Sequence, residues 1–453
     1  MEFTAWTLFV DVGLMSLLLL FGFLIRSKVR FVQNLFLPAS LLAGFMGLIL
    51  GPNGFNLLPF SASIGKYSGI LIALVFAALP LASQKVPFKT ISKRVGNMWA
   101  YSQSVMILQW GLGALFGLVV IKAIWGDVNP GFGLMLASGF SGGHGTAAAI
   151  GDAFAGHGWD DAATLAMTSA TVGVVSAIVG GLIIIKMGSR KGFTKFITDF
   201  EDLPTELKTG LIPEENRESA GNNTVSPISV DPLLFHLALI SGISVLGYYI
   251  AKFGAKLMPQ IRIPTFCVAF IVGVILMKVF ENTGADKYID KRIVTRISGS
   301  ATDMLVAFGI ASIKLPVVVA YAGPLALLFL FGLAYCWFMF RVLGPRMFTT
   351  YWFEKSIFTW GWATGTMAMG IALLKIIDPD LKSKTLDDFA LAYIPMSPVE
   401  IAVVSFAPLL FVNGQGWTFT AVTVGFGIAV LLFAYMKGWL KQNQYDVQDK
   451  KAV

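Results

Sequence analysis

Residues 138–149, SGFSGGHGTAAA, form a glycine-dense tract set between long apolar segments. Glycine is a weak helix former, and backbone N–H and C=O groups in hydrocarbon must find partners within the protein. Such backbone survives at membrane depth only where protein or a water-filled cavity covers it. The tract therefore predicts a binding site inside a membrane protein.

The composition indicates a polytopic membrane protein. The 453 residues are 56% hydrophobic and only 13% charged, against roughly 25% charged residues in soluble domains. The net charge of +8 arises from short basic clusters beside apolar runs, which favours membrane orientation over nucleic-acid binding. The two cysteines, Cys267 and Cys336, lie far apart in apolar runs and predict neither a disulfide framework nor a thiolate metal site.

Eleven apolar segments are each about long enough to cross a hydrocarbon core of about 30 Å. They are expected near residues 6–25, 36–53, 67–84, 97–123, 161–187, 232–256, 263–280, 299–320, 323–341, 387–411 and 416–436. Two weaker segments, 131–155 and 357–376, are expected to enter and leave on one side as re-entrant hairpins. The basic clusters then fall mostly on one face, taken as cytoplasmic, which places the N-terminus outside and the C-terminus inside.

This arrangement predicts an all-α fold of two inverted five-helix repeats. Residues 1–187 form the first repeat, residues 188–230 a cytoplasmic linker, residues 231–411 the second repeat, and residues 412–453 an extra helix with a cytoplasmic tail. Because five spans precede the linker, the second half starts from the opposite face, as in inverted-repeat transporters.

Sequence similarity between the halves favours the repeat. LPASLLAGFMGLIL at 37–50 aligns without gaps on IPTFCVAFIVGVIL at 263–276, with Pro, Ala, Gly, Ile and Leu in register. GTAAA at 145–149 matches GTMAM at 365–369. The two matches occur in the same order in both halves, which chance similarity among apolar segments rarely produces.

Both hairpin tips combine glycine with small hydroxyl residues. The candidate substrate-binding residues are Ser141, Gly142, Gly143, Gly145 and Thr146 in the first tip and Thr364, Gly365 and Thr366 in the second. Exposed carbonyls and hydroxyls there suit a sodium ion, and N–H groups at a half-helix start suit a carboxylate. Close helix packing through small residues is the alternative, but both segments are too polar for ordinary spans.

Three further residues are candidates for ion binding or coupling. Asp303 is an acid within a predicted span, suited to a cation site or a coupling proton, unless it pairs with a base near the helix end. Glu400 is the next such acid. Thr171 follows the first hairpin and faces either the same cavity or a neighbouring helix.

Residues 139–143, GFSGG, also fit the G-x-S-x-G nucleophile elbow. That motif needs a strand before the serine and an α/β sheet around it. The flanks here are membrane segments, so no enzyme is expected.

Three parts of the sequence are distinctive: SGGHGT at 141–146, the helix containing AM at 166–167 and AT at 170–171, and PTF at 264–266 with GVIL at 273–276. Together they resemble the sodium/glutamate symporter family. The resemblance implies sodium-coupled glutamate uptake in a bacterial inner membrane, two inverted five-helix repeats with re-entrant hairpins, a homodimer and an elevator-like movement. Family members tend to follow the second hairpin's threonine with proline and an AIANM-like stretch. Here Thr366 is followed by MAMGIA.

The sequence thus predicts a secondary active transporter that imports glutamate or a related small carboxylate-bearing amino acid by alternating access. Na⁺ is the coupling ion, and no soluble cofactor is expected. A proton-coupled organic-anion carrier is the first alternative and an ion channel the second. Channels usually repeat in parallel around a pore, whereas this chain is expected to repeat upside-down.

Overall fold

The computed structural model describes residues 4–35, 37–82, 88–196, 209–257, 264–379 and 381–440, and all regular structure in these ranges is helical. Ten helical segments are long and apolar enough to cross a membrane, so the prediction of an all-helical, multi-pass membrane protein is confirmed. Their helices are α1 (Ala5–Lys28), α4 (Ile64–Ala82), α5 (Phe88–Phe116), α9 (Ala162–Arg190), α11 (Pro232–Leu257), α12 (Thr265–Thr283), α13 (Lys291–Ala311), α15 (Ala322–Phe338), α19 (Thr385–Val412) and α20 (Gly416–Met436).

Shorter helical elements connect these spans. They are α2 (Arg30–Asn34), α3 (Ala39–Leu50), α6 (Lys122–Ile124), α7 (Leu134–Gly139), α8 (Gly143–Ala155), α14 (Leu315–Ala320), α16 (Gly344–Met347), α17 (Trp352–Thr364) and α18 (Met367–Ile377). The 3₁₀-helices are η2 (Pro130–Gly133), η4 (Glu214–Asn216) and η5 (Ala285–Tyr288). The π-helical turns are η1 (Gly117–Ile121) and η6 (Met339–Leu343).

The expected span at 36–53 is a shorter helix than predicted. Helix α3 has 12 residues, about 18 Å at about 1.5 Å per residue, which is less than a 30 Å core. It ends because the chain turns back after Gly51: the Phe55 and Leu57 N–H groups donate to the Ile49 and Leu50 carbonyls at 2.7 and 2.8 Å. Ten helical segments of the described chain, not eleven, therefore meet the length of a span.

The span expected at 299–320 is displaced toward the N-terminus. Helix α13 begins eight residues earlier because the Asp290 carboxylate caps it, accepting from the backbone N–H groups of Arg292 and Ile293 at 2.8 and 3.2 Å. It ends before Pro316, which has no N–H to continue the helical hydrogen bonds. The last expected residues form the separate helix α14.

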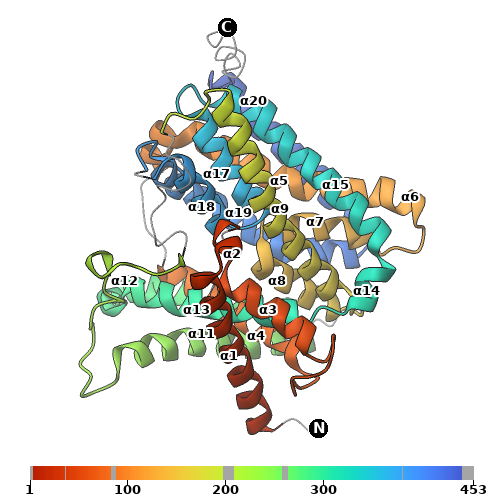
Figure 1. Ribbon diagram of the computed structural model, residues 1–453. Helices are drawn as coiled ribbons and strands as arrows, with labels where there is room; N and C mark the ends of the chain where they lie inside the picture. The colour runs from red at the N-terminus through yellow and green to blue at the C-terminus, as the bar shows by residue number, and fades with distance from the viewer. Residues whose placement is uncertain are drawn as a thin grey trace.

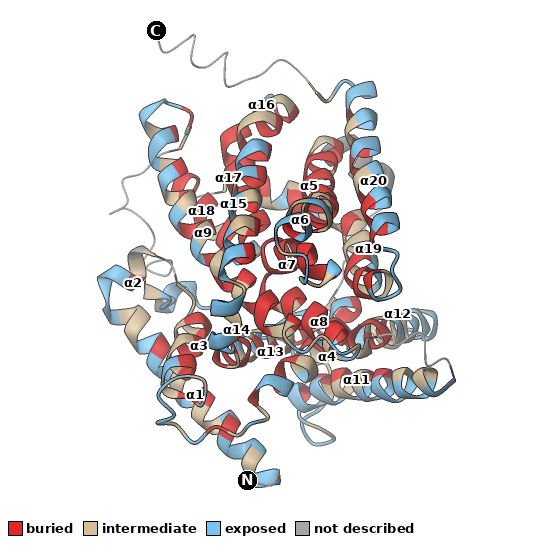
Figure 2. Ribbon diagram, turned by 90° about the vertical axis from the view of Figure 1, so that its right-hand side faces the viewer, coloured by how far each residue is buried: buried red, intermediate tan, exposed pale blue. Residues whose placement is uncertain are grey.

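The helices form two layers, which Figures 1 and 2 show from directions 90° apart. One layer contains α1, α3, α4 and α11 to α13, and the other contains α5, α7 to α9, α15 and α17 to α20. Helices α7, α8 and α17 are almost entirely buried within the second layer (Figure 2). Each half of the chain contributes its first long helices to one layer and its later helices to the other.

The packing of the two halves corresponds element by element. Helix α3 packs on α1 and α13, just as α12 packs on α11 and α4, and α4 and α13 pack on each other. Gly47 of α3 lies against Ala311 of α13, and Gly273 of α12 lies against the backbone of Ala77 in α4. Both α5 and α15 end in a π-helical turn just before the next short helix. The aligned sequences 38–50 and 264–276 therefore occupy corresponding places.

The described part of the linker is fastened to the start of α13. The backbone N–H of Asn222 donates to the Asp290 carboxylate at 2.8 Å, and the Thr224 hydroxyl donates to the Tyr288 carbonyl at 2.6 Å. Residues 197–208 of the expected linker, and 441–453 of the expected tail, lie outside the described ranges.

Candidate functional site

Both predicted tips are breaks between two short helices. Helices α7 and α8 are separated by residues 140–142, and Gly143 adopts a left-handed φ of +61° that disfavours any side chain. Helices α17 and α18 are separated by Gly365 and Thr366. The glycines thus lie where the backbone leaves helical geometry, as their composition predicted.

The two breaks touch each other. A Cβ atom placed on Gly143 would lie 2.8 Å from Thr366 Cγ2 and 3.2 Å from the Gly365 carbonyl oxygen. Only a residue without a side chain permits this approach. Residues from opposite halves of the chain therefore meet in one site.

Helix α9 passes beside both breaks and presents small residues to them. A Cβ on Gly173 would overlap the Thr364 carbonyl oxygen and lie 3.1 Å from Phe140 Cδ1. A Cβ on Gly365 would lie 2.8 Å from Ala177 Cβ. The middle of α9 thus brings the two tips together.

His144 connects the first tip to α9 by a directed hydrogen bond. Its Nε2 lies 3.2 Å from Thr171 Oγ1, and both side chains are buried. The Thr171 hydroxyl donates its single proton to the Met167 carbonyl at 2.9 Å, so it accepts from His144. The neutral imidazole therefore has its proton on Nε2, which leaves Nδ1 as an acceptor.

The hydroxyl groups at the tips differ in whether they already have a hydrogen-bond partner. Ser141 and Thr364 donate to the backbone carbonyls one turn earlier, at 3.0 and 2.6 Å. Thr366 Oγ1 accepts from the Met369 N–H at 3.4 Å and so caps α18. Thr146 packs its side chain over Gly142. The fully buried Ser169 hydroxyl lies against Gly139 and has no hydrogen-bond partner among the described residues.

The helix ends give the site both signs of partial charge. Helices α8 and α18, of 13 and 11 residues, begin at the breaks, and α7 and α17 end there. Helix starts present free N–H groups and attract anions, and helix ends present carbonyls that attract cations. Across the described ranges no three His, Cys, Asp or Glu side chains group as a metal site.

A family model described as sodium/glutamate symporter matches residues 5–349. The chain belongs to the sodium/glutamate symporter family. The matched residues include the first tip and α9, and they end before α17, so the second tip lies beyond them. No curated protein is similar enough to the chain to provide a relative.

Three predicted residues lie apart from the contact between the tips. Gly145 faces the other layer, where a Cβ would lie 3.5 Å from Ile72 Cδ1. Asp303 is exposed on α13 and interacts with the Ser40 side chain of α3. The Glu400 carboxylate accepts from the Tyr393 hydroxyl at 2.9 Å within α19. The structure brings Ser141, Gly142, Gly143, Thr146, Thr171, Thr364, Gly365 and Thr366 to the breaks or beside them.

Two residues that the structure singles out are not among the predicted site residues. Gly173 of α9 contacts both breaks, at Phe140 and at the Thr364 carbonyl, and in the sequence it is marked only as a glycine inside the helix 162–190. Asp11 is a buried acid in α1, and its carboxylate accepts from the Ser61 N–H at 2.8 Å and the Tyr67 hydroxyl at 2.6 Å. In the sequence it is marked only as an acid within the apolar run 6–25, and its role is to tie α1 to α4.

Ser141 is preceded by helix α7, not by the strand that a nucleophile elbow needs.

Proposed function

We propose that this symporter imports glutamate, or a related small carboxylate-bearing amino acid, together with Na⁺ by alternating access. The observation that supports this most directly is the contact of Gly143 with Gly365 and Thr366 beside α9. A site shared by two helix starts and two helix ends provides for an anionic group and a cation together.

The substrate carboxylate binds to backbone N–H groups in the first turns of α8 and α18. Apart from the Met369 N–H, which donates to Thr366, these groups have no acceptor within their own helices, and the helix dipoles favour a negative charge there. Thr146, which packs over Gly142, and Thr366, which contacts Gly143, provide hydroxyl groups. The charge of the substrate is thus balanced by oriented backbone instead of a buried base.

The sodium ion binds to carbonyl oxygens at the ends of α7 and α17 and to nearby hydroxyls, with Ser169 as a ligand that has no other partner. Each ligand neutralises part of the charge that the other brings to the buried site, so each raises the affinity for the other. This reciprocal effect couples the sodium gradient to uptake.

Two inverted five-helix repeats would allow such a site to face either side of the membrane. The matching packing of α3 and α12, and the π-helical turns that end α5 and α15, support a repeat with α7–α8 and α17–α18 as re-entrant hairpins. The proposed orientation has the N-terminus outside, the C-terminus in the cytoplasm, and the chain as a homodimer in a bacterial inner membrane.

The movement between the two states is an elevator-like displacement of the layer with the tips against the other layer. Small residues line the contact between them: Gly309 of α13 lies against Met167 of α9, and Gly69 of α4 lies against Asp152 of α8. Packed surfaces of this kind permit shear without unfolding.

Uptake of radiolabelled glutamate into proteoliposomes tests the proposal. We expect uptake to require an inward sodium gradient, and we expect Thr146→Val and Thr366→Val each to lower the initial rate at least about tenfold, equivalent to about 1.4 kcal/mol. Thr420→Val is the matched control, because the Thr420 hydroxyl bonds only within α20 at 2.9 Å, to Gly416.

Other results would contradict separate parts of the proposal. Equal rates in all three variants would exclude the tips as the site. Sodium-independent uptake that follows a pH gradient would favour a proton-coupled carrier, and single-channel currents would favour a channel.

A further inference from the structure

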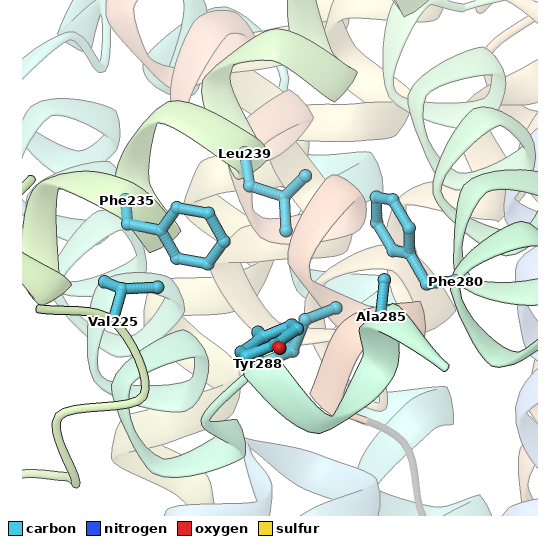
Figure 3. A pocket seen from close by; sticks show the side chains of 7 residues that line it. Val225, Phe235, Leu239, Phe280, Ala285 and Tyr288 are labelled. Atoms are coloured by element: carbon cyan, nitrogen blue, oxygen red, sulfur yellow. The ribbon is translucent and has the colours of Figure 1, made fainter. Parts of the chain in front are cut away.

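A cavity of about 360 Å³ lies between α11, α12 and η5, in the layer that does not contain the tips (Figure 3). Its walls are formed by Phe235 and Leu239 of α11, Phe280 of α12, Ala285 and Tyr288 of η5, and Val225 of the linker. Apart from the Tyr288 hydroxyl, these side chains are apolar. The cavity therefore suits a hydrocarbon ligand.

The position of the cavity matches the edge of a membrane. Phe235 is in the first turn of α11, and Phe280 is in the last turn of α12. Both helices are long and apolar enough to cross a membrane. Their ends lie where lipid acyl chains meet head groups.

The segment beside the cavity is rich in basic side chains. Lys287 and Arg292 are exposed, and Lys287 Nζ lies 5.1 Å from the centre of the Tyr288 ring at the cavity wall. Four acids lie in the same segments. Asp290 is already engaged by three backbone N–H groups, Asp231 accepts from the Leu233 and Leu234 N–H groups, Glu281 pairs with Lys278 at 3.9 Å, and Asp286 is the fourth. An anionic head group is attracted to such a cluster at the cytoplasmic side of a membrane.

We propose that this cavity binds an acyl chain of an anionic glycerophospholipid, whose phosphate lies at Lys287 and Arg292. A peptide segment fits less well, because its backbone N–H and C=O groups would need partners that the apolar walls do not provide. The lipid would join α11, α12 and the linker at Val225. This role is independent of the proposed transport reaction.

Native mass spectrometry and thermal unfolding of the full-length protein test the site, with palmitoyl-oleoyl phosphatidylglycerol and the matching phosphatidylcholine as probes. We expect about one tightly retained phosphatidylglycerol per chain, a larger rise in Tm than with phosphatidylcholine, and at least fivefold lower retention in Leu239→Trp, which fills the cavity. Leu246→Trp is the control, because Leu246 is on the same helix, half exposed, and outside the cavity.

The charge of the site is tested separately. We expect the pair Lys287→Gln and Arg292→Gln to remove the preference for phosphatidylglycerol, while Lys252→Gln with Lys256→Gln, at the other end of α11, leaves it unchanged. Ala285→Leu, a smaller addition to the same wall, replaces Leu239→Trp if that variant does not fold.

Two results would overturn the proposal. Equal retention of the two lipids by the unmodified protein would exclude an anionic head-group site. Lower retention in the lysine and arginine variants but not in the cavity-filling variants would show surface attraction without an acyl-chain site.

Discussion

Gly143 lies in direct contact with Thr366, so a Cβ on the glycine would be 2.8 Å from the threonine Cγ2. The two residues begin, or cap, helices from opposite halves of the chain. Their contact brings together two helix starts, and the anion-attracting ends of α8 and α18 then act on one small volume. Any side chain at 143 would separate them.

Gly143→Ala is expected to lower the initial rate of glutamate uptake at least about tenfold. Alanine strains the left-handed backbone at φ +61°, a cost of about 1–3 kcal/mol, and its methyl group pushes the second tip away. The measurement is uptake by equal amounts of folded protein in proteoliposomes. Gly425→Ala is the control, because no atom lies within 4 Å of a Cβ at that helical position. An unchanged rate in Gly143→Ala would mean that the contact does not matter for transport.

The sequence predicted the helix breaks because their signals are local. Glycine and hydroxyl residues at 139–146 and 364–366 interrupt apolar runs, and the breaks occur there. Contact between the tips depends on how α9 packs between distant segments, which no local pattern encodes. The sequence therefore does not indicate the role of Gly173, which touches both tips.

The start of α13 shows a second limit of sequence patterns. Its first turns contain Lys291, Arg292 and Arg296, so the apolar run begins only near residue 299. The helix begins earlier because Asp290 caps it and the linker covers that cap. The hydropathy pattern also does not show that Asp303 lies on the exposed side of α13.

Thr171→Val is expected to lower the free energy of unfolding by about 1–3 kcal/mol, because it leaves the buried His144 Nε2–H without an acceptor. Thr171→Ser keeps the hydroxyl and should retain most of the stability. Thr168→Val is the control on the same helix, because the Thr168 hydroxyl bonds only to the Thr164 carbonyl one turn earlier. The measurement is denaturant unfolding in detergent. Equal losses in Thr171→Val and Thr168→Val would contradict the role of the histidine bond.

Acid is expected to release the linker from α13 through Asp290. Burial would raise the pKa of the Asp290 carboxyl, but N–H groups of Asn222, Ile293 and Arg292 donate to it and hold the pKa below its usual value of about 3.9. A lowered pKa in the folded state means that the carboxylate stabilises the fold fully above about pH 4 and loses this effect as the pH falls further. Hydrogen exchange of residues 219–224 should therefore accelerate below about pH 4.

Asp290→Asn should accelerate the same exchange at pH 7 and remove its dependence on acid. Asp231→Asn is the matched control, because Asp231 caps α11 through the Leu233 and Leu234 N–H groups without contacting the linker residues 219–224. If the variant keeps the acid response of the unmodified protein, another group holds the linker.

Lys355→Met is expected to cost about 3 kcal/mol of unfolding free energy, because it removes one partner of a largely buried ion pair. Lys355 Nζ lies 2.9 Å from Asp388 Oδ2, with side chains only 9% and 17% exposed, and the variant takes this positive charge away from a carboxylate that water solvates poorly. The double variant with Asp388→Leu should recover most of the loss in unfolding free energy, since it removes both charges.

Lys278→Met is the control. Its pair with Glu281 is 3.9 Å long and Lys278 is 71% exposed, so the change in unfolding free energy should stay below about 1 kcal/mol. The pair of Lys355 and Asp388 joins α17 to α19. A double variant no more stable than Lys355→Met would show that Lys355 acts mainly through packing, for example over the Phe348 ring at 5.2 Å.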